Sequence, residues 1–165
     1  MNRWSFVLVS LLLLVAIFFG WLWFHRPPDR LFVASRIWFS LARAGKGLSE
    51  VDAQNLAGLV LRDIGREIMS EDFNMARKVY APGVVLKGEG GCRIAVKNAS
   101  LKVDNVELYL HSLCISDESL CIEFEVKGLK NAVILPGVGR IYPDVPNTLV
   151  VDDRGVERGS EGCLR

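Results

Sequence analysis

Residues 4–24 (WSFVLVSLLLLVAIFFGWLWF) form an uncharged and almost wholly apolar run. An α-helix needs roughly 20 apolar residues to cross the hydrocarbon core of a bilayer. Trp4 stands at one end of the run, and Trp21 and Trp23 stand at the other, where aromatic side chains meet the membrane–water interface. The run therefore predicts a transmembrane helix, with residues 1–3 as a short tail before it.

The end of this run argues against removal as a secretory signal. A signal peptide has a shorter apolar region and ends in small residues that a peptidase recognises. Here residues 20–24 read GWLWF, with no A-x-A pattern. We expect an uncleaved anchor and one domain attached to it.

The orientation of the anchor is indicated by two signals that disagree. Basic residues follow the run, whereas only Arg3 precedes it, and by the positive-inside rule this distribution would keep the following domain in the cytosol. The chain also has four cysteines, and paired cysteines persist in oxidising compartments. We favour export, which places the domain outside the cytoplasm of a single-pass protein of the inner (plasma) membrane, in the periplasm.

The charges of the whole chain are nearly balanced, with 20 basic and 19 acidic residues. A nucleic-acid-binding protein carries a strongly basic surface, which this composition does not supply. The predicted partners are therefore the lipid bilayer and a protein in the membrane or envelope, and not nucleic acid.

Residues 25–47 predict a juxtamembrane linker and an amphipathic helix. Pro27 and Pro28 end the first helix, and residues 29–46 then place apolar side chains on one broad face and polar ones, including Ser35, on the other. A basic polar face is typical of a helix that lies on anionic lipid, although a helix packed against its own domain is the alternative. The predicted membrane-interface residues are Trp21, Trp23, Arg26, Arg30, Arg36, Trp38 and Arg43.

Residues 48–82 predict a helical segment. Ser49 followed by Asp52 resembles a capping box, and apolar residues then recur at helical spacing. A third, shorter helix is expected to begin at Ser70 and to include Tyr80, before Pro82 and the glycine after it.

Residues 83–151 no longer show helical spacing of apolar residues, and they predict a β domain. About seven short segments alternate apolar and polar residues, and glycines and prolines separate them, which is typical of an antiparallel sheet or sandwich. Residues 152–165 are charged and are expected to form an irregular tail. The predicted fold class is α+β, with a transmembrane helix, an amphipathic helix and short helices before the sheet.

One hairpin, over residues 106–126, carries a sharper prediction. Leu110 and Leu113 can face the same side of the incoming strand only if one extra residue is accommodated at His111-Ser112. A β-bulge inserts one such residue and reorients the residues that follow. We therefore predict a bulge at His111-Ser112.

With this bulge, Cys114 lies opposite Cys121 on the outward face of the hairpin, at a separation that a disulfide accepts. The favoured pairing is Cys114–Cys121 with Cys92–Cys163, while other pairings and reduced thiols stay open. Zinc knuckles and redox motifs need closely spaced cysteines, which are missing here. No metal or cofactor site is predicted.

No catalytic residues are predicted, because the chain has no recognisable catalytic constellation. The leading hypothesis is a non-catalytic interaction domain, either an accessory subunit of an envelope assembly or an immunity-type binding protein. A lipid-handling β domain is the first alternative, because the apolar faces of residues 103–126 follow a membrane-lying helix. The second is an enzyme that uses Cys114 as a nucleophile beside His111.

Overall fold

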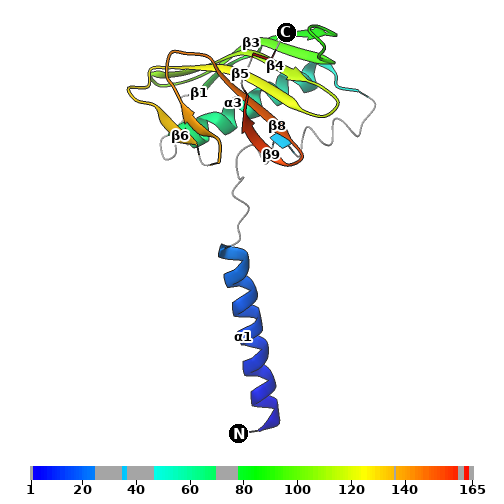
Figure 1. Ribbon diagram of the computed structural model, residues 1–165, viewed down its shortest axis with the longest axis vertical. Coiled ribbons are helices and arrows are strands. Elements are labelled where there is room, and N and C mark those ends of the chain that lie inside the picture. The colour runs from blue at the N-terminus through cyan, green and yellow to red at the C-terminus, as the bar shows by residue number, and fades with distance from the viewer. Residues whose placement is uncertain are drawn as a thin grey trace.

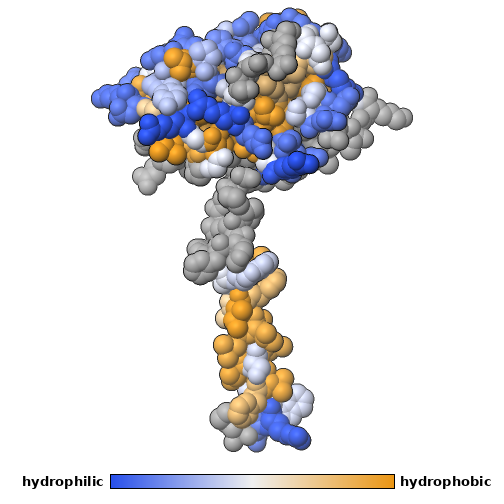
Figure 2. Space-filling model, viewed as in Figure 1, coloured by the Kyte–Doolittle hydropathy of each residue, from blue (hydrophilic) through white to orange (hydrophobic). Residues whose placement is uncertain are grey.

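The structure is a computed structural model that describes residues 2–24, 35–36, 47–69, 78–135, 137–159 and 162–163. The apolar run folds as one helix, α1 (Arg3–Phe24), which Figure 1 shows extending away from the sheet domain. Its apolar window has a mean hydropathy of 2.6 and none of it is buried (Figure 2). At 1.5 Å per residue the helix is about 33 Å long, so α1 is long and apolar enough to cross a membrane.

The second described long helix is α3 (Glu50–Met69). Asp52 N donates to Ser49 Oγ, and Ser49 N donates to Asp52 Oδ2, both at 3.2 Å. This reciprocal pair is the predicted capping box. The helix buries the apolar stripe that its spacing predicts, and the buried apolar side chains are Ala53, Leu56, Ala57, Val60, Leu61 and Ile64.

Seven strands form one antiparallel sheet in the order β1-β3-β4-β5-β8-β9, with β2 also paired to β3. The strands are β1 (Lys78–Ala81), β2 (Val84–Lys87), β3 (Ile94–Val103), β4 (Val106–Ile115), β5 (Leu120–Lys127), β8 (Asn147–Asp152) and β9 (Gly155–Arg158). A separate hairpin joins β6 (Val133–Leu135) to β7 (Gly139–Ile141).

Helix α3 covers one face of this sheet, where it contacts β2, β3 and β4, and it also contacts β6 of the separate hairpin (Figure 1). The inward side chains of the strands and the apolar stripe of α3 form one buried core. The predicted α+β class with an antiparallel sheet is therefore confirmed. A helix, and not the second sheet of a sandwich, covers the apolar face.

Two boundaries of the predicted β domain are wrong. Residues 78–81, predicted as the end of a helix, form strand β1, because Tyr80 pairs with Leu101 and its hydroxyl donates to Gln54 O at 2.9 Å. The beginning of that predicted helix, residues 70–77, lies outside the described residues. Strand β9 occupies part of the predicted irregular tail.

The turn before β9 explains why this strand forms. The Asp152 carboxylate accepts hydrogen bonds from the backbone amides of Arg154 and Gly155, at 2.8 and 3.1 Å. An aspartate that bonds the amides two and three residues on stabilises a tight reversal of the chain. This reversal returns the chain alongside β8.

Most of the predicted interfacial helix lies outside the described residues, as do Arg26, Arg30, Trp38 and Arg43. Ser35 and Arg36 are helical, but Ser35 is fully buried and contacts α3. Ser35, predicted on the polar face of a helix that lies on lipid, instead bonds a buried carboxylate of the domain. This contact favours a helix packed on its own domain. Trp21 and Trp23 both fall within α1.

The predicted bulge at His111-Ser112 is confirmed. The pairing of β4 with β5 shifts by one residue between Leu110 and Ser112. On the neighbouring strand, Asn98 lies between the pairs that flank His111 and has a φ of 60°. The alternation of inward and outward side chains is therefore interrupted at the same level on β3 and β4.

The interruption of strand pairing at this level continues to the edge of the sheet. Strands β1 and β2 pair with β3 in one continuous register, interrupted at Pro82 and Gly83. Pro82 has no amide to donate to the ladder. A Cβ at Gly83 would lie 2.5 Å from Lys97 O and 3.0 Å from Ala99 N. Only glycine fits this close approach of two backbones.

We expect Gly83→Ala to lower the free energy of unfolding by about 1–3 kcal/mol, because the new methyl group must displace backbone atoms. Gly58→Ala is the matched control, since its Cβ would meet the Tyr80 ring at an ordinary 3.5 Å. In a helix this change stabilises by up to about 1 kcal/mol. Urea unfolding of both variants in detergent tests the expectation, and equal effects of the two substitutions would contradict it.

Candidate functional site

The candidate site is the outer face of the sheet, opposite α3. Strand alternation sends every second side chain of β3, β4 and β5 to this face. Among the described residues, α3 is the helix that contacts β3 and β4, and it lies on the other face. Because of the bulge, His111 and Ser112 both point outward. We call Asn98, Tyr109, His111, Glu125 and Lys127 the outer-face cluster.

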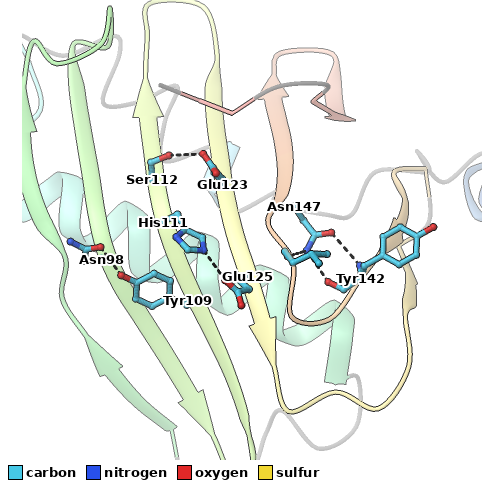
Figure 3. Close-up of polar contacts among 9 residues, drawn as sticks. Asn98, Tyr109, His111, Ser112, Glu123, Glu125, Tyr142 and Asn147 are labelled. Atoms are coloured by element: carbon cyan, nitrogen blue, oxygen red, sulfur yellow. Dashed lines mark hydrogen bonds and ion pairs between the residues drawn. The ribbon is translucent and has the colours of Figure 1, made fainter. Parts of the chain in front are cut away.

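Four members of the outer-face cluster, Asn98, Tyr109, His111 and Glu125, lie side by side on β3, β4 and β5 (Figure 3). The Tyr109 hydroxyl donates to Asn98 Oδ1 at 2.6 Å, and His111 Nε2 donates to Glu125 Oε2 at 2.9 Å. The rings of Tyr109 and His111 meet edge to face, with centroids 4.8 Å apart. Lys127 Nζ lies 5.9 Å from the centre of the Tyr109 ring. The network fixes an aromatic ring among polar groups at the centre of an open face.

A second polar pair lies beside the cluster. Ser112 Oγ donates to Glu123 Oε2 at 3.4 Å, a long and weak hydrogen bond. A serine–histidine–carboxylate triad would need the serine hydroxyl to bond the histidine, but Ser112 bonds Glu123 and His111 bonds Glu125. Among the described residues, no three metal-ligating side chains form a group. The arrangement is suited to recognition, because tyrosine supplies much of the binding energy at many protein interfaces.

All four predicted cysteines are in disulfides, but the predicted pairing is wrong. Cys92 bonds Cys114 with Cα atoms 5.4 Å apart, and Cys121 bonds Cys163 with Cα atoms 5.5 Å apart. Cys114 and Cys121 are directly opposed, as the bulge predicts. Each of them nevertheless bonds a cysteine that comes from outside the hairpin.

Local backbone geometry explains the position of Cys92. Gly90 and Gly91 both have positive φ, at 60° and 80°, and Cys92 N donates to Glu89 O at 3.0 Å. This turn folds Cys92 back against Ala95 and Cys114, where it is only 2% exposed. The pattern of apolar residues does not report such a turn, so it could not reveal the pairing.

A buried acid, Asp63, lies on the covered face of α3 and is only 6% exposed. Ser35 Oγ donates to Asp63 Oδ2 at 2.5 Å. Burial raises the pKa of Asp63 above its ordinary value, and this effect exceeds the opposing effects of the Ser35 hydroxyl and of Arg66 and Arg62. The sequence analysis missed this residue because a polar side chain inside an apolar stripe has no periodicity of its own.

This raised pKa predicts how stability changes with pH. The folded state holds the Asp63 proton more tightly than the unfolded state, so stability falls as pH rises from the ordinary aspartate pKa through the raised one. Asp63→Asn stays neutral and should remove this fall, so the variant gains stability relative to the parent chain as pH rises. Urea unfolding across pH 3 to about 7 measures the difference; a difference that is constant with pH would contradict the expectation.

One groove lies between α3 and β1. Its volume is about 520 Å³, and its lining residues are Asn55, Gly58, Leu59, Arg62, Lys78, Tyr80 and Leu101. Lys78, one of its two cationic residues, has an interaction of its own. Residues 70–77, which connect α3 to β1, lie outside the described residues. The described lining residues of the groove therefore do not indicate a class of ligand.

Comparisons with protein-family models, with curated proteins and with solved structures found no match to this chain. Function is therefore inferred from the chain's own residues. Helix α1 and the two disulfides are compatible with a membrane-anchored, disulfide-stabilised domain. The disulfides also suggest an oxidising compartment.

Proposed function

We propose that the chain is a single-pass inner-membrane protein whose sheet domain lies in the periplasm and binds another protein without catalysis. It acts as an accessory subunit of an envelope assembly or as an immunity-type binding protein. The bilayer holds α1, and the outer face of the sheet receives the partner.

The outer-face cluster is the observation that carries this proposal. A polar network held between neighbouring strands loses little conformational freedom when a partner binds, because its side chains are already ordered. Tyr109 lies at its centre, with Asn98, His111 and Lys127 in contact with it. Tyrosine is one of the residue types in which interface hot spots are enriched.

Two observations count against the alternatives. The inward side chains of β3, β4 and β5 form one buried core with the apolar stripe of α3, so the protein's own side chains fill this part of the sheet face. This disfavours a lipid-handling domain. Cys114 is bonded to Cys92 and carries no free thiol, which disfavours a cysteine nucleophile.

Site-specific photo-crosslinking of the full chain in its native membrane tests the proposal. A photoreactive residue at Lys102, on the outer face of β3, should form a defined protein adduct, and one at Val51, which is 64% exposed on α3 on the other side of the sheet, should not. Removing a hot-spot side chain costs about 2 kcal/mol of binding energy, so Tyr109→Ala should weaken partner binding about 30-fold and reduce the Lys102 adduct. Equal adducts from Lys102 and Val51, or an adduct at Lys102 that Tyr109→Ala does not change, would contradict the proposal.

A further inference from the structure

The described residues that follow β9 are Gly159, Gly162 and Cys163. Gly159 N donates to Thr148 O at 2.9 Å. A Cβ at Gly159 would lie 2.7 Å from Thr148 Cγ2 and 3.5 Å from Val150 Cγ2. Thr148 and Val150 are outward residues of β8, since their neighbours Leu149 and Val151 are in the core. Gly159 therefore continues the pairing of β9 with β8, in register opposite Thr148.

The same segment reaches β5. A Cβ at Gly162 would lie 3.1 Å from Glu123 Oε2, and Cys163 is bonded to Cys121. Glu123 is the acceptor of the Ser112 hydrogen bond next to the outer-face cluster. We call Gly162 and Cys163 the strap; both lie against outward side chains of β5, at one end of the candidate interaction face.

The two disulfides differ in their exposure. Cys92 is 2% exposed and Cys114 is 9% exposed, whereas Cys121 and Cys163 are both partly exposed. A thiol reductant must reach a sulfur atom to attack it. It therefore reaches the disulfide of the strap before the buried one.

Cys121 also lies next to a second possible disulfide partner, Cys114. It is the register partner of Cys114, and it packs against the buried cluster of Cys92, Ala95 and Cys114. Directly opposed residues in an antiparallel pair have Cα atoms about 4.5–5.5 Å apart, within the range that a disulfide accepts. A thiolate at Cys121 would thus have the sulfur of Cys114 as its nearest disulfide target.

We propose that the strap is a redox-released cover of the outer face, and that Cys121 changes partner from Cys163 to Cys114 when the strap opens. A dithiol protein outside the cytoplasm attacks the sulfur of Cys163 and expels Cys121 as a thiolate. The second thiol of the reductant then releases Cys163 and leaves the reductant oxidised. The Cys121 thiolate attacks the sulfur of Cys114, a Cys114–Cys121 disulfide forms, and Cys92 leaves as a thiolate that takes a proton from water.

The net change is one disulfide reduced by two electrons and one disulfide exchanged. The consequence for binding rests on the proposed function, because it assumes that the outer face receives a partner. The exchange itself requires no partner, so its test and the test of the proposed function fail separately.

Disulfide mapping of the full chain in detergent tests the exchange. The protein is treated with increasing dithiothreitol, quenched with acid, unfolded and alkylated with N-ethylmaleimide, and its peptides are then mapped. The first species should carry alkyl groups on Cys163 and Cys92 and a disulfide between Cys114 and Cys121. Alkylation of Cys121 together with Cys163, while Cys92–Cys114 stays intact, would overturn the exchange; alkylation of Cys92 and Cys114 first would overturn the strap as the reducible element.

A variant gives an independent measurement without reductant. In Cys163→Ser, Cys121 begins without its partner and takes Cys114 instead, so we expect N-ethylmaleimide to label Cys92. The matched control is Cys121→Ser combined with Cys163→Ser, which should retain Cys92–Cys114 and take up no label. Labelling of Cys121 alone in the single variant would overturn the proposal, as would labelling of Cys92 in the double variant.

Discussion

Phe124→Ala is expected to lower the free energy of unfolding by about 3–5 kcal/mol, which is the usual cost of removing a buried aromatic ring. Phe124 is fully buried on β5, where it pairs with Leu110 of β4 and Asn147 of β8. Its ring therefore lies in the middle of the sheet, between α3 and the outer face. The loss includes both the transfer of the ring to water and the cavity that the neighbours cannot refill.

Ile134→Ala provides the control for this prediction. Ile134 is also a large apolar residue in a strand, but it is 67% exposed. Surface substitutions of this kind change stability by no more than about 0.5 kcal/mol. Urea unfolding of both variants in detergent, with the disulfides intact, makes the comparison. Similar losses for the two variants would show that the core is not placed as described.

Removing either disulfide is expected to have an effect of comparable size. In the chain-entropy model, the 22-residue separation of Cys92 and Cys114 gives about 3 kcal/mol, and the 42-residue separation of Cys121 and Cys163 gives about 4 kcal/mol. Replacing each pair with alanine should therefore lower the midpoint of urea unfolding substantially. A loss below about 1 kcal/mol for a pair would mean that this pair does not restrain the unfolded chain.

The two double-alanine variants also distinguish the stabilising role of the strap disulfide from its role in covering the outer face. If the strap covers the outer face, the pair Cys121→Ala with Cys163→Ala should lose stability and increase the photo-crosslink yield from Lys102. The pair Cys92→Ala with Cys114→Ala should lose stability without this increase, because that disulfide does not hold the strap. An equal change in crosslink yield for both pairs would contradict the covering role.

Much of the domain could be predicted from the alternation of apolar residues, because burial alone determines which side chains face α3. Leu110 and Leu113 both belong to the core, and no regular strand can point both inward, so the bulge between them followed from the residues themselves. The capping box at Ser49 and the apolar stripe of α3 could be predicted for the same reason: each is a local pattern with one structural solution.

Features that depend on contacts distant in sequence could not be predicted in this way. Tyr80 continues a helical pattern, but its pairing with Leu101 in the sheet overrides that local preference. Cys92 reaches Cys114 only because two glycines in left-handed conformations turn it back over the sheet. The outer-face cluster was missed because outward polar residues carry no periodic signal beyond that of an exposed strand.

Thiol accounting on the full chain taken from its native membrane tests most directly whether the domain lies in an oxidising compartment with its cysteines paired as described. The membranes are alkylated with and without reductant, and the cysteine peptides are then mapped. We predict no alkylation without reductant, alkylation of all four cysteines after full reduction, and peptides joined as Cys92–Cys114 and Cys121–Cys163. Four free thiols in the untreated membrane would contradict the account and would place the domain on the cytosolic side, as the basic residues after α1 favour.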